Sequence, residues 1–357
     1  MMSRSESSGQ PLVSVLFPCY NAAEFQVQSL ESILNQTYRN LEIIIIDDGS
    51  TDNTVDIVKK YADQDPRIRF YQNPENRKLI FTLNRGIEIA SGKYIARMDS
   101  DDISFPERIE KLVAVLEDSP EVDFASSGFY IIDTKGKIIY TSVPKALTGK
   151  PLKFVSFFST PLLHPGLLIR SELLKTAGFS SEYIHCEDYE LFSRLVMNGR
   201  VARNISKPLI YYRANPASVS NQYEHIQINS HTRISLRNIE SYFNITPEYF
   251  THKIMIFRIA FTVKLKALKE AIKLLLVLRD RYIEREKCSD SEISEIDYFI
   301  IEQKIDIIFQ AIKHARHVMK IPLIIYLLFN SRLITNRRGF SYLRAKIGSK
   351  TTAYKVF

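Results

Sequence analysis

Cysteine is scarce in this chain of 357 residues, and its spacing excludes two common kinds of protein. The three cysteines, Cys19, Cys186 and Cys288, are far apart, odd in number and form no Cys-x-x-Cys pair. A disulfide framework or a zinc site is therefore not expected. A reducing compartment is the simpler interpretation.

Long apolar runs are missing as well. Residues 1–10 are polar and serine-rich, without the apolar core of a signal peptide, so we expect a disordered start and a cytoplasmic protein. The longest apolar stretch of the C-terminal part, Ile321 to Phe329, is well short of the roughly 20 residues that span a bilayer. No Gly-x-Gly-x-x-Gly follows the first expected strand, which argues against a dinucleotide-dependent oxidoreductase.

The first hundred residues alternate between two kinds of pattern. Apolar or β-branched runs at 13–17, 41–46, 68–70 and 94–98 predict strands, and apolar residues at helical spacing between them predict helices. The run 41–46 is nearly continuous, as in a parallel strand covered on both faces. This order predicts an α/β fold with a doubly wound, mainly parallel sheet.

Polar residues follow three of these strands. Tyr20, Asp48 and the cluster Asp99-Ser100-Asp101-Asp102 come at the carboxyl ends, where open parallel sheets bind ligands. Three carboxylates packed at a strand end repel each other, and a divalent cation that prefers oxygen ligands, such as Mg²⁺ or Mn²⁺, would remove that repulsion. The alternative is a solvated acidic turn.

These residues resemble the family 2 glycosyltransferases with the GT-A fold. The resemblance covers roughly residues 11–220 and implies a GT-A domain over residues 11–240. The region 241–357, helical in pattern and poor in glycine, is expected to form a basic helical C-terminal domain. The matching blocks are Val13 to Asn21, Ser32 to Tyr38, Ile46 to Asp52, Asn84 to Ile87, Ser91 to Tyr94, Asp99 to Asp102 with Pro106 and Arg108, and Cys186 to Leu191.

The resemblance also implies an activity. The implied enzyme is a metal-dependent inverting glycosyltransferase of the hexosyltransferase type. Such an enzyme moves a sugar from a nucleotide diphosphate donor, a UDP-sugar in our interpretation, to a hydroxyl of a glycan or lipid-linked acceptor in surface polysaccharide synthesis. The alternative from another class is a non-catalytic nucleotide-sugar-binding or scaffold protein, against which the intact Asp188 argues.

The resemblance assigns roles at the nucleotide end of the site. Asp48 would accept a hydrogen bond from the base, Tyr20 would stack on or flank that base, and Pro18 would shape the loop. Asp99 would contact the ribose or phosphate side, and Asp101 would bind Mn²⁺ or Mg²⁺. From the residues alone, capping of the next helix is the favoured role for Asp48, and for Tyr20 a boundary aromatic with a hydrated hydroxyl is an equal alternative.

At the acceptor end, the resemblance makes Asp188 the general base, because a sugar hydroxyl is a poor nucleophile until its proton is accepted. Glu187 would hold acceptor hydroxyls or tune Asp188. Acidic residues at the start of a predicted helix also complement the helix dipole, and spacing alone favours that structural role. Asp102 would orient either neighbouring aspartate or cap the helix near Pro106.

Four further residues are candidates for the same site. His164 is a minor candidate for the diphosphate or acceptor, and Arg213, in a segment that precedes Ser218-Val219-Ser220, for phosphate. A surface salt bridge is an equal alternative for Arg213. Arg77 and Lys78 are candidate nucleotide contacts. They also depart from the family, whose members commonly carry a small flexible glycine after the equivalent of Asn76, so the loop shape and donor-sugar preference are open.

The basic charge lies in the C-terminal part. Residues 251–357 hold 21 lysines and arginines and 10 acidic residues, a charge of +11, whereas the whole chain carries +8. A helical bundle or dimerisation domain with a solvated basic face is one interpretation, and peripheral docking on the inner face of the cell membrane is the other. We expect no nucleic-acid partner, since no such motif is present. Homo-oligomerisation is left open.

Overall fold

The computed structural model describes residues 9–142, 147–215, 223–257 and 265–314. Most of the expected disordered start, the segment 218–220 and the basic residues from 315 onward therefore lie outside the described part of the chain. The chain divides into two compact units. An α/β unit comprises residues 1–149 and 161–230, and a helical unit comprises residues 150–160 and 231–357.

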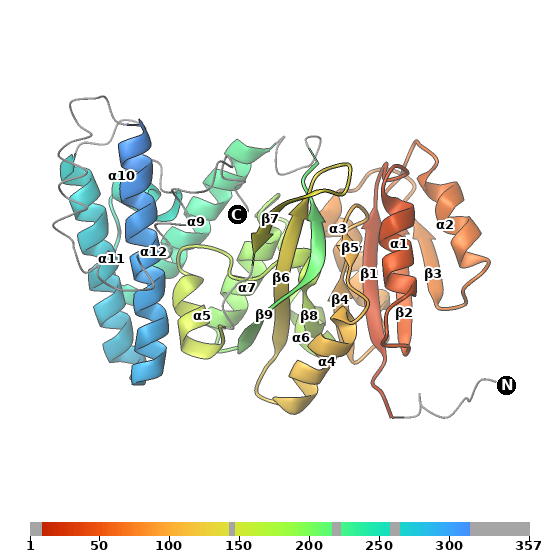
Figure 1. The fold of residues 1–357 in the computed structure, drawn as a ribbon, viewed down its shortest axis with the longest axis horizontal. Helices are drawn as coiled ribbons and strands as arrows, with labels where there is room; N and C mark the ends of the chain where they lie inside the picture. Colours follow the sequence, from red (N-terminus) through yellow and green to blue (C-terminus); the bar gives the residue numbers. More distant parts are fainter. Residues whose placement is uncertain (1–8, 143–146, 216–222, 258–264, 315–357) are drawn as a thin grey trace. The chain divides into compact units, whose positions relative to one another are not determined.

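The α/β unit is built on one sheet, which contains nine strands within the described residues (Figure 1). Its main path runs in the order β3-β2-β1-β4-β8-β6-β9-β5, and β7 pairs with β6. Strands β1, β2, β3, β4, β6 and β9 run in the same direction, while β5, β7 and β8 oppose them. The strands are β1 (Val13–Cys19), β2 (Leu41–Asp47), β3 (Ile68–Gln72), β4 (Tyr94–Arg97), β5 (Ile103–Ser104), β6 (Phe124–Ile132), β7 (Ile138–Ser142), β8 (Leu168–Arg170) and β9 (Ala202–Arg213).

Helices cover both faces of the parallel half of this sheet. On one face, α1 (Gln26–Leu34), α2 (Thr54–Ala62) and α4 (Arg108–Asp118) pack apolar side chains onto β1, β2 and β4. On the other face, α3 (Leu79–Ile89) contacts β1, β2 and α6 (Ser171–Ala177). The fully buried β2 explains the continuous apolar run in the sequence. The predicted α/β fold with a mostly parallel sheet is confirmed.

Two other sequence expectations have clear outcomes in this unit. The predicted hairpin over residues 130–141 is present, because β6 and β7 pair antiparallel around the turn 133–137. The strand expected over 166–169 begins later. A 3-10 turn, His164–Gly166, comes first and β8 starts at Leu168, because the N–H groups of Gly166 and Leu167 donate within the turn, to the carbonyls of Leu163 and His164. Helix α7 (Glu187–Met197) begins at the Glu187 where the sequence predicts it.

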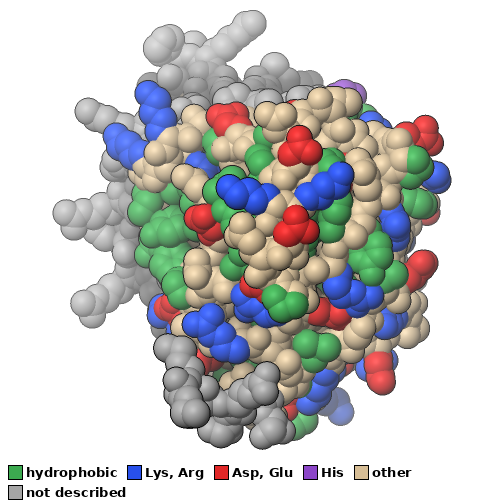
Figure 2. Space-filling model, turned by 90° about the vertical axis from the view of Figure 1, so that its right-hand side faces the viewer, with side chains coloured by type: hydrophobic (Ala, Val, Ile, Leu, Met, Phe, Trp, Pro, Cys, Tyr) green, Lys and Arg blue, Asp and Glu red, His purple; other side chains and the backbone are tan. Residues whose placement is uncertain are grey.

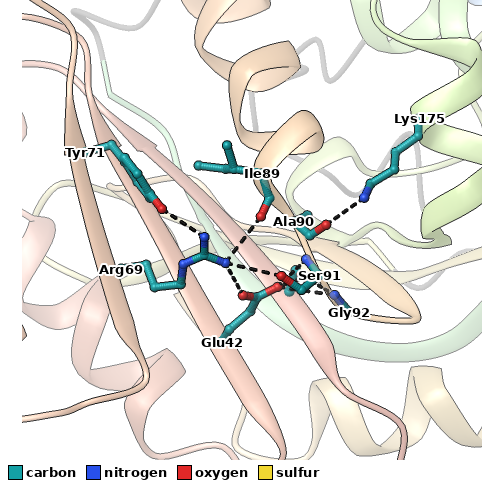
Figure 3. Close-up of polar contacts among 9 residues, drawn as sticks. Glu42, Arg69, Tyr71, Ile89, Ala90, Ser91, Gly92 and Lys175 are labelled. Atoms are coloured by element: carbon teal, nitrogen blue, oxygen red, sulfur yellow. Dashed lines mark hydrogen bonds and ion pairs between the residues drawn. The ribbon is translucent and has the colours of Figure 1, made fainter.

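A buried carboxylate joins the starts of the parallel strands (Figure 3). Glu42, on β2, accepts hydrogen bonds from the Ser14 hydroxyl and from the backbone N–H groups of Ser91, at 2.6 Å, and Gly92, at 3.2 Å. It also pairs with Arg69 at 2.6 Å. Burial raises the pKa of Glu42, but these hydrogen bonds outweigh burial and hold its pKa below the ordinary value.

Removing this carboxylate is expected to destabilise the α/β unit. Glu42→Ala removes the carboxylate that the Ser14 hydroxyl, the Ser91 N–H and the Arg69 guanidinium share, at a cost of about 2–4 kcal/mol, although Arg69 keeps its bonds to Tyr71 and Ile89. Urea unfolding followed by circular dichroism measures the change. Glu88→Ala, at an exposed position of α3, is the matched control and should stay within about 0.5 kcal/mol of wild type. Equal stabilities of the two variants would contradict the role given to Glu42.

The face of the α/β unit that carries β3 and α2 has a mixed charge. Lysine and arginine side chains are interspersed there with aspartate and glutamate (Figure 2). The exposed residues of α2 illustrate this, because Asp56 lies within one turn of Lys59 and Lys60. Neighbouring charges of opposite sign cancel at a distance, so this face does not gather a strong field of one sign.

The helical unit has an aromatic core. Phe154, Phe157 and Phe158 come from the segment 150–160, and their rings contact Tyr282 and other rings of the C-terminal helices. Among the described residues, no helix is long and apolar enough to cross a membrane. The first residue of α5 belongs to the α/β unit and the rest of that helix to the helical unit. The helices of the helical unit are α5 (Gly149–Val155), most of α9 (Glu224–Phe243), α10 (Tyr249–Phe257), α11 (Leu265–Glu286) and α12 (Asp290–His314).

Candidate functional site

The candidate site residues lie at the carboxyl ends of adjacent parallel strands. The register of β1 and β2 pairs Cys19 with Asp47, so Tyr20 and Asp48 leave the sheet side by side. The acidic turn that starts at Asp99 follows β4, the other neighbour of β1. The structure thus brings together three features that are far apart in the sequence, at the edge where open parallel sheets bind ligands.

Asp48 is buried and organises the loop after β3. Its Oδ1 accepts hydrogen bonds from Asn73 Nδ2 at 2.6 Å and from the backbone N–H of Arg77 at 2.9 Å. Its Oδ2 accepts one from the backbone N–H of Lys78 at 2.8 Å. Asp48 therefore ties β2 to the loop 73–78, in addition to the base contact that the sequence analysis proposes.

Tyr20 and Arg77 leave aromatic and cationic groups near this loop. The Tyr20 side chain is 47% exposed, so its ring is accessible to a ligand. Pro18 lies within β1, two residues before Tyr20. The Arg77 guanidinium lies 4.3 Å from the centre of the exposed Phe81 ring. A flat base could stack on either surface, since aromatic rings and guanidinium planes both offer stacking faces.

The turn after β4 concentrates negative charge. Asp99 pairs with the buried Arg97 at 2.6 Å. Burial, and then the charge of Asp99, raise the pKa of Asp101 to about 6. Burial, and then Asp101 and Asp99, raise the pKa of Asp102 well above its ordinary value. Folding therefore forces carboxylates together against their own electrostatic preference.

Arg213 holds this turn from β9. Its backbone N–H donates to Asp102 Oδ1 at 2.8 Å, and its Nε donates to the carbonyl of Asp101 at 2.8 Å. Its guanidinium also donates to Gln28 Oε1 at 3.0 Å and lies 4.5 Å from the centre of the Phe25 ring. The side chain is 3% exposed. These contacts make Arg213 a clamp on the acidic turn, and its burial rules out the surface salt bridge considered from the sequence, while the phosphate contact stays a prediction.

The acidic turn fits a hard divalent cation. Asp102 Oδ2 is buried without a hydrogen-bond partner, and the pKa of Asp101 is raised, as expected of carboxylates that lack a counter-charge. Within the described residues, no group of three or more His, Cys, Asp or Glu side chains is arranged to enclose a metal ion. One or two carboxylates completed by substrate oxygens match the way Mg²⁺ is bound in phosphate sites.

Glu187 and Asp188 are the first two residues of α7, and the pKa of each carboxyl group is raised. Burial raises the pKa of Asp188 to about 6, and a hydrogen bond to its Oδ1 from the Tyr189 N–H, at 2.7 Å, opposes that rise. Burial, and then the charge of Asp188, raise the pKa of Glu187 to about 8. Charges of Asp99 and Arg97 act on both groups, so α7 faces the acidic turn. Burial raises both pKa values, and the charge of Asp188 raises that of Glu187 further, so the two carboxyl groups together retain a proton more readily than isolated carboxyl groups do.

His164 is buried in an aromatic environment. Its ring lies 5.3 Å from that of Phe179 and 6.1 Å from that of Phe192, and its Nε2 has no hydrogen-bond partner. Burial, and then the charge of Arg97, lower its pKa well below the ordinary value. A neutral imidazole packed in this way supports the wall of the site, and its Nε2 is left for a ligand to meet.

Asn73 is a further residue of the site that the sequence does not single out. Its Nδ2 donates to Asp48 and to the Thr82 hydroxyl, and its Oδ1 accepts a hydrogen bond from Arg85. Asn73 directly follows β3, so the rule about carboxyl ends of parallel strands would have pointed to it. No local pattern identifies it as functional, because an asparagine after a strand is ordinary turn chemistry.

The fold is that of an α/β protein that gathers carboxylates at the carboxyl ends of its parallel strands and at the start of α7. A model of the family described as "Glycosyl transferase family 2" matches residues 14–175. An uncharacterized glycosyltransferase of Haemophilus influenzae is 35% identical over 243 residues, which cover 66% of this chain and 75% of the relative. The chain belongs to glycosyltransferase family 2 and is an enzyme of the glycosyltransferase type.

A relative of defined activity and a solved structure agree with this assignment. The Escherichia coli enzyme WfaP, named as a UDP-Glc:α-D-GlcNAc-diphosphoundecaprenol β-1,3-glucosyltransferase, is 33% identical over 58% of this chain and 80% of its own length. The structure of Staphylococcus aureus TarS 1–349 in complex with UDP has a TM-score of 0.52 at 18% identity, over 93% of this chain and 89% of TarS. That likeness supports the GT-A fold.

Proposed function

We propose that the protein transfers a sugar from a nucleotide diphosphate donor, a UDP-sugar, to a hydroxyl of a lipid-linked or glycan acceptor in surface polysaccharide synthesis. The observation that carries the proposal is the presence of an acidic turn after β4, with an unpartnered buried carboxylate oxygen on Asp102, together with Asp188 at the start of α7. The name of WfaP, with its UDP-sugar donor and diphosphate-linked lipid acceptor, supports this choice of substrates.

The proposed reaction is a single displacement that inverts the anomeric carbon. The acceptor oxygen forms a bond to that carbon, the bond from the carbon to the diphosphate oxygen breaks, and the nucleoside diphosphate leaves. Asp188 accepts the proton of the acceptor hydroxyl as this bond forms. Glu187, whose pKa is raised by burial and by the charge of Asp188, would hold an acceptor hydroxyl beside Asp188.

At the nucleotide end, Asp48 would bind the base, Tyr20 would stack on it, and Asp99 would contact the ribose side. Asp101, oriented by Asp102 and by the clamp of Arg213, would hold Mn²⁺ or Mg²⁺. Such a cation neutralises the diphosphate and the charge that develops on the leaving group. Because Asp101 is already part of a repulsive cluster, its carboxylate is poised to accept a cation at neutral pH.

A donor screen tests this function. UDP-, GDP- and dTDP-sugars are incubated with the full chain and an undecaprenyl-diphosphate-linked GlcNAc acceptor, with Mn²⁺ or with EDTA, and nucleotide release is followed. We expect UDP release that depends on both the acceptor and Mn²⁺. Binding of UDP without transfer to any acceptor would favour a scaffold role, and absence of binding to every nucleotide sugar would remove the proposal.

We further propose that the basic helical region docks on the inner face of the membrane that holds such an acceptor. In α11, Lys266, Lys269 and Lys273 are exposed at the spacing of one helix face, while Leu268 and Ile272 are buried. Vesicle flotation is expected to recover the full chain with anionic but not neutral lipids. Reversing the three lysines to glutamate should reduce recovery severalfold, and flotation that is unchanged by this reversal would contradict the docking surface.

A further inference from the structure

Two non-glycine residues next to the candidate groups have unusual backbone conformations. Lys78, immediately before α3, has φ 71° and ψ 164°, and His185, two residues before α7 begins, has φ 64°. The conformation of Lys78 is one that glycine alone adopts readily, so a lysine there is strained. Such strain persists where the surrounding contacts impose it, and it clusters at ligand sites.

The contacts that impose the conformation of Lys78 come from the nucleotide end of the site. Its backbone N–H donates to Asp48 Oδ2 at 2.8 Å and to Asn76 Oδ1 at 3.1 Å. These backbone contacts fix the point at which the Lys78 side chain leaves the main chain, beside Asp48.

The side chains of Lys78 and His185 both have unused hydrogen-bonding capacity. Among the residues that the structure describes, neither the exposed Lys78 ammonium nor the His185 ring nitrogens have a hydrogen-bond or ion-pair partner. The His185 ring is fixed by stacking on Tyr223, with centroids 4.3 Å apart and an interplanar angle of 13°. Burial, and then the charge of Lys78, lower the pKa of His185, so the two groups lie within electrostatic range of each other.

Other cations near the acidic turn are already engaged. Arg97 pairs with Asp99 and donates to the carbonyl of Met98. Arg108 is fully buried and donates to Ser104 Oγ at 2.7 Å and to two backbone carbonyls. Arg213 is committed to the turn itself. Lys78, by contrast, is a cation beside Asp48 whose side chain keeps its donors for an anionic ligand.

We propose that Lys78 and His185 together bind a phosphate group of the substrate. The inference rests on the proposed function and deepens it, because Lys78 is tethered to the nucleotide-end Asp48 and His185 lies three residues before the acceptor-end Asp188. In a nucleotide-sugar donor, the diphosphate lies between the nucleoside, which Asp48 would bind, and the sugar, which the acceptor beside Asp188 would attack. A diphosphate-linked acceptor offers the same chemistry from the other side. Both residues act as donors of charge-assisted hydrogen bonds to phosphate oxygens.

Four variants of the full chain test this inference. Lys78→Ala removes the ammonium, Lys78→Arg keeps a cation, Lys78→Gly removes the ammonium and the strain together, and His185→Asn keeps a residue that tolerates positive φ but removes the imidazole. Lys60→Ala, an exposed lysine in the last turn of α2, is the matched control. Binding of UDP with Mn²⁺ is measured by calorimetry, and binding of uridine by ligand-observed NMR.

We expect Lys78→Ala, Lys78→Gly and His185→Asn each to weaken UDP binding by roughly tenfold, the effect of losing a hydrogen bond to a charged group. Uridine binding should not change, and Lys78→Arg should retain most of the UDP affinity. Lys78→Gly should also unfold at a higher temperature than Lys78→Ala, because it relieves the strain. Lys60→Ala should match wild type throughout.

The acceptor arm distinguishes the source of the phosphate. If UDP affinity is unchanged while KM rises for the diphosphate-linked acceptor but not for the same glycan without phosphate, the site serves the acceptor and the inference stands. Equal weakening of UDP and uridine, or wild-type behaviour of all variants toward both substrates, would overturn it. Failure of the wild-type chain to bind any nucleotide would instead remove the proposed function.

Discussion

Asp188→Asn is expected to lower kcat by about a hundred- to ten-thousand-fold, the usual contribution of a general base. Asparagine has nearly the same shape, and its Oδ1 can still accept the hydrogen bond from the Tyr189 N–H, so the start of α7 should be preserved. UDP affinity should be unchanged, because Asp188 is assigned to the acceptor end. Initial rates and UDP calorimetry separate the two quantities.

Glu187→Gln is the matched control for this prediction. Because the pKa of Glu187 is raised to about 8, glutamine resembles the form already present at pH 7, and the loss should be much smaller. In wild type, kcat/KM should fall as the pH drops below about 6, when Asp188 takes up a proton and can no longer accept one. Wild-type turnover by Asp188→Asn would remove Asp188 from the mechanism.

Asp101→Asn is expected to weaken UDP binding in the presence of Mn²⁺ by at least tenfold, roughly the loss that altered metal coordination causes. The amide keeps the size of the side chain but removes the charge that would hold the cation. Calorimetry with Mn²⁺ and with EDTA measures the metal-dependent part. EDTA should weaken UDP binding by the wild-type chain to the level of the variant. Asp118→Asn, at an exposed position at the end of α4, is the control and should bind UDP as wild type does.

The same variant should gain stability in EDTA. Burial and Asp99 raise the pKa of Asp101 to about 6, so at pH 7 its ionised form destabilises the folded state relative to the unfolded one. Asparagine removes that cost, and the unfolding temperature should equal or exceed that of wild type. UDP binding that is indifferent to EDTA, together with an unchanged affinity of Asp101→Asn, would contradict a metal at this turn.

The parts of the fold that follow from local patterns could be predicted from sequence. Continuous apolar runs identify strands buried on both faces, as in β2, and the rule for open parallel sheets then places Tyr20, Asp48 and the acidic turn at one edge. The roles within that edge depend on the family resemblance, because an aspartate after a strand is also ordinary turn chemistry.

Contacts between distant segments could not be predicted. Arg213 is held by groups at positions 28, 101, 102 and 133, which no periodicity in the sequence relates to one another. The strain at Lys78 is also invisible locally, since the sequence shows only that a glycine is replaced. It becomes meaningful once Asp48 is seen to hold the backbone N–H.

The helical unit is discontinuous in sequence, and this limits how the chain can be shortened. Residues 150–160 leave the α/β unit, complete the aromatic core with Phe154, Phe157 and Phe158, and return at residue 161. A polypeptide that stops near residue 240 would retain these three rings without the helices that bury them. Such a fragment would expose apolar side chains on residues 150–160, which interrupt the α/β unit in the sequence, and it would tend to aggregate. Its aggregation would say nothing about whether catalysis needs the C-terminal helices.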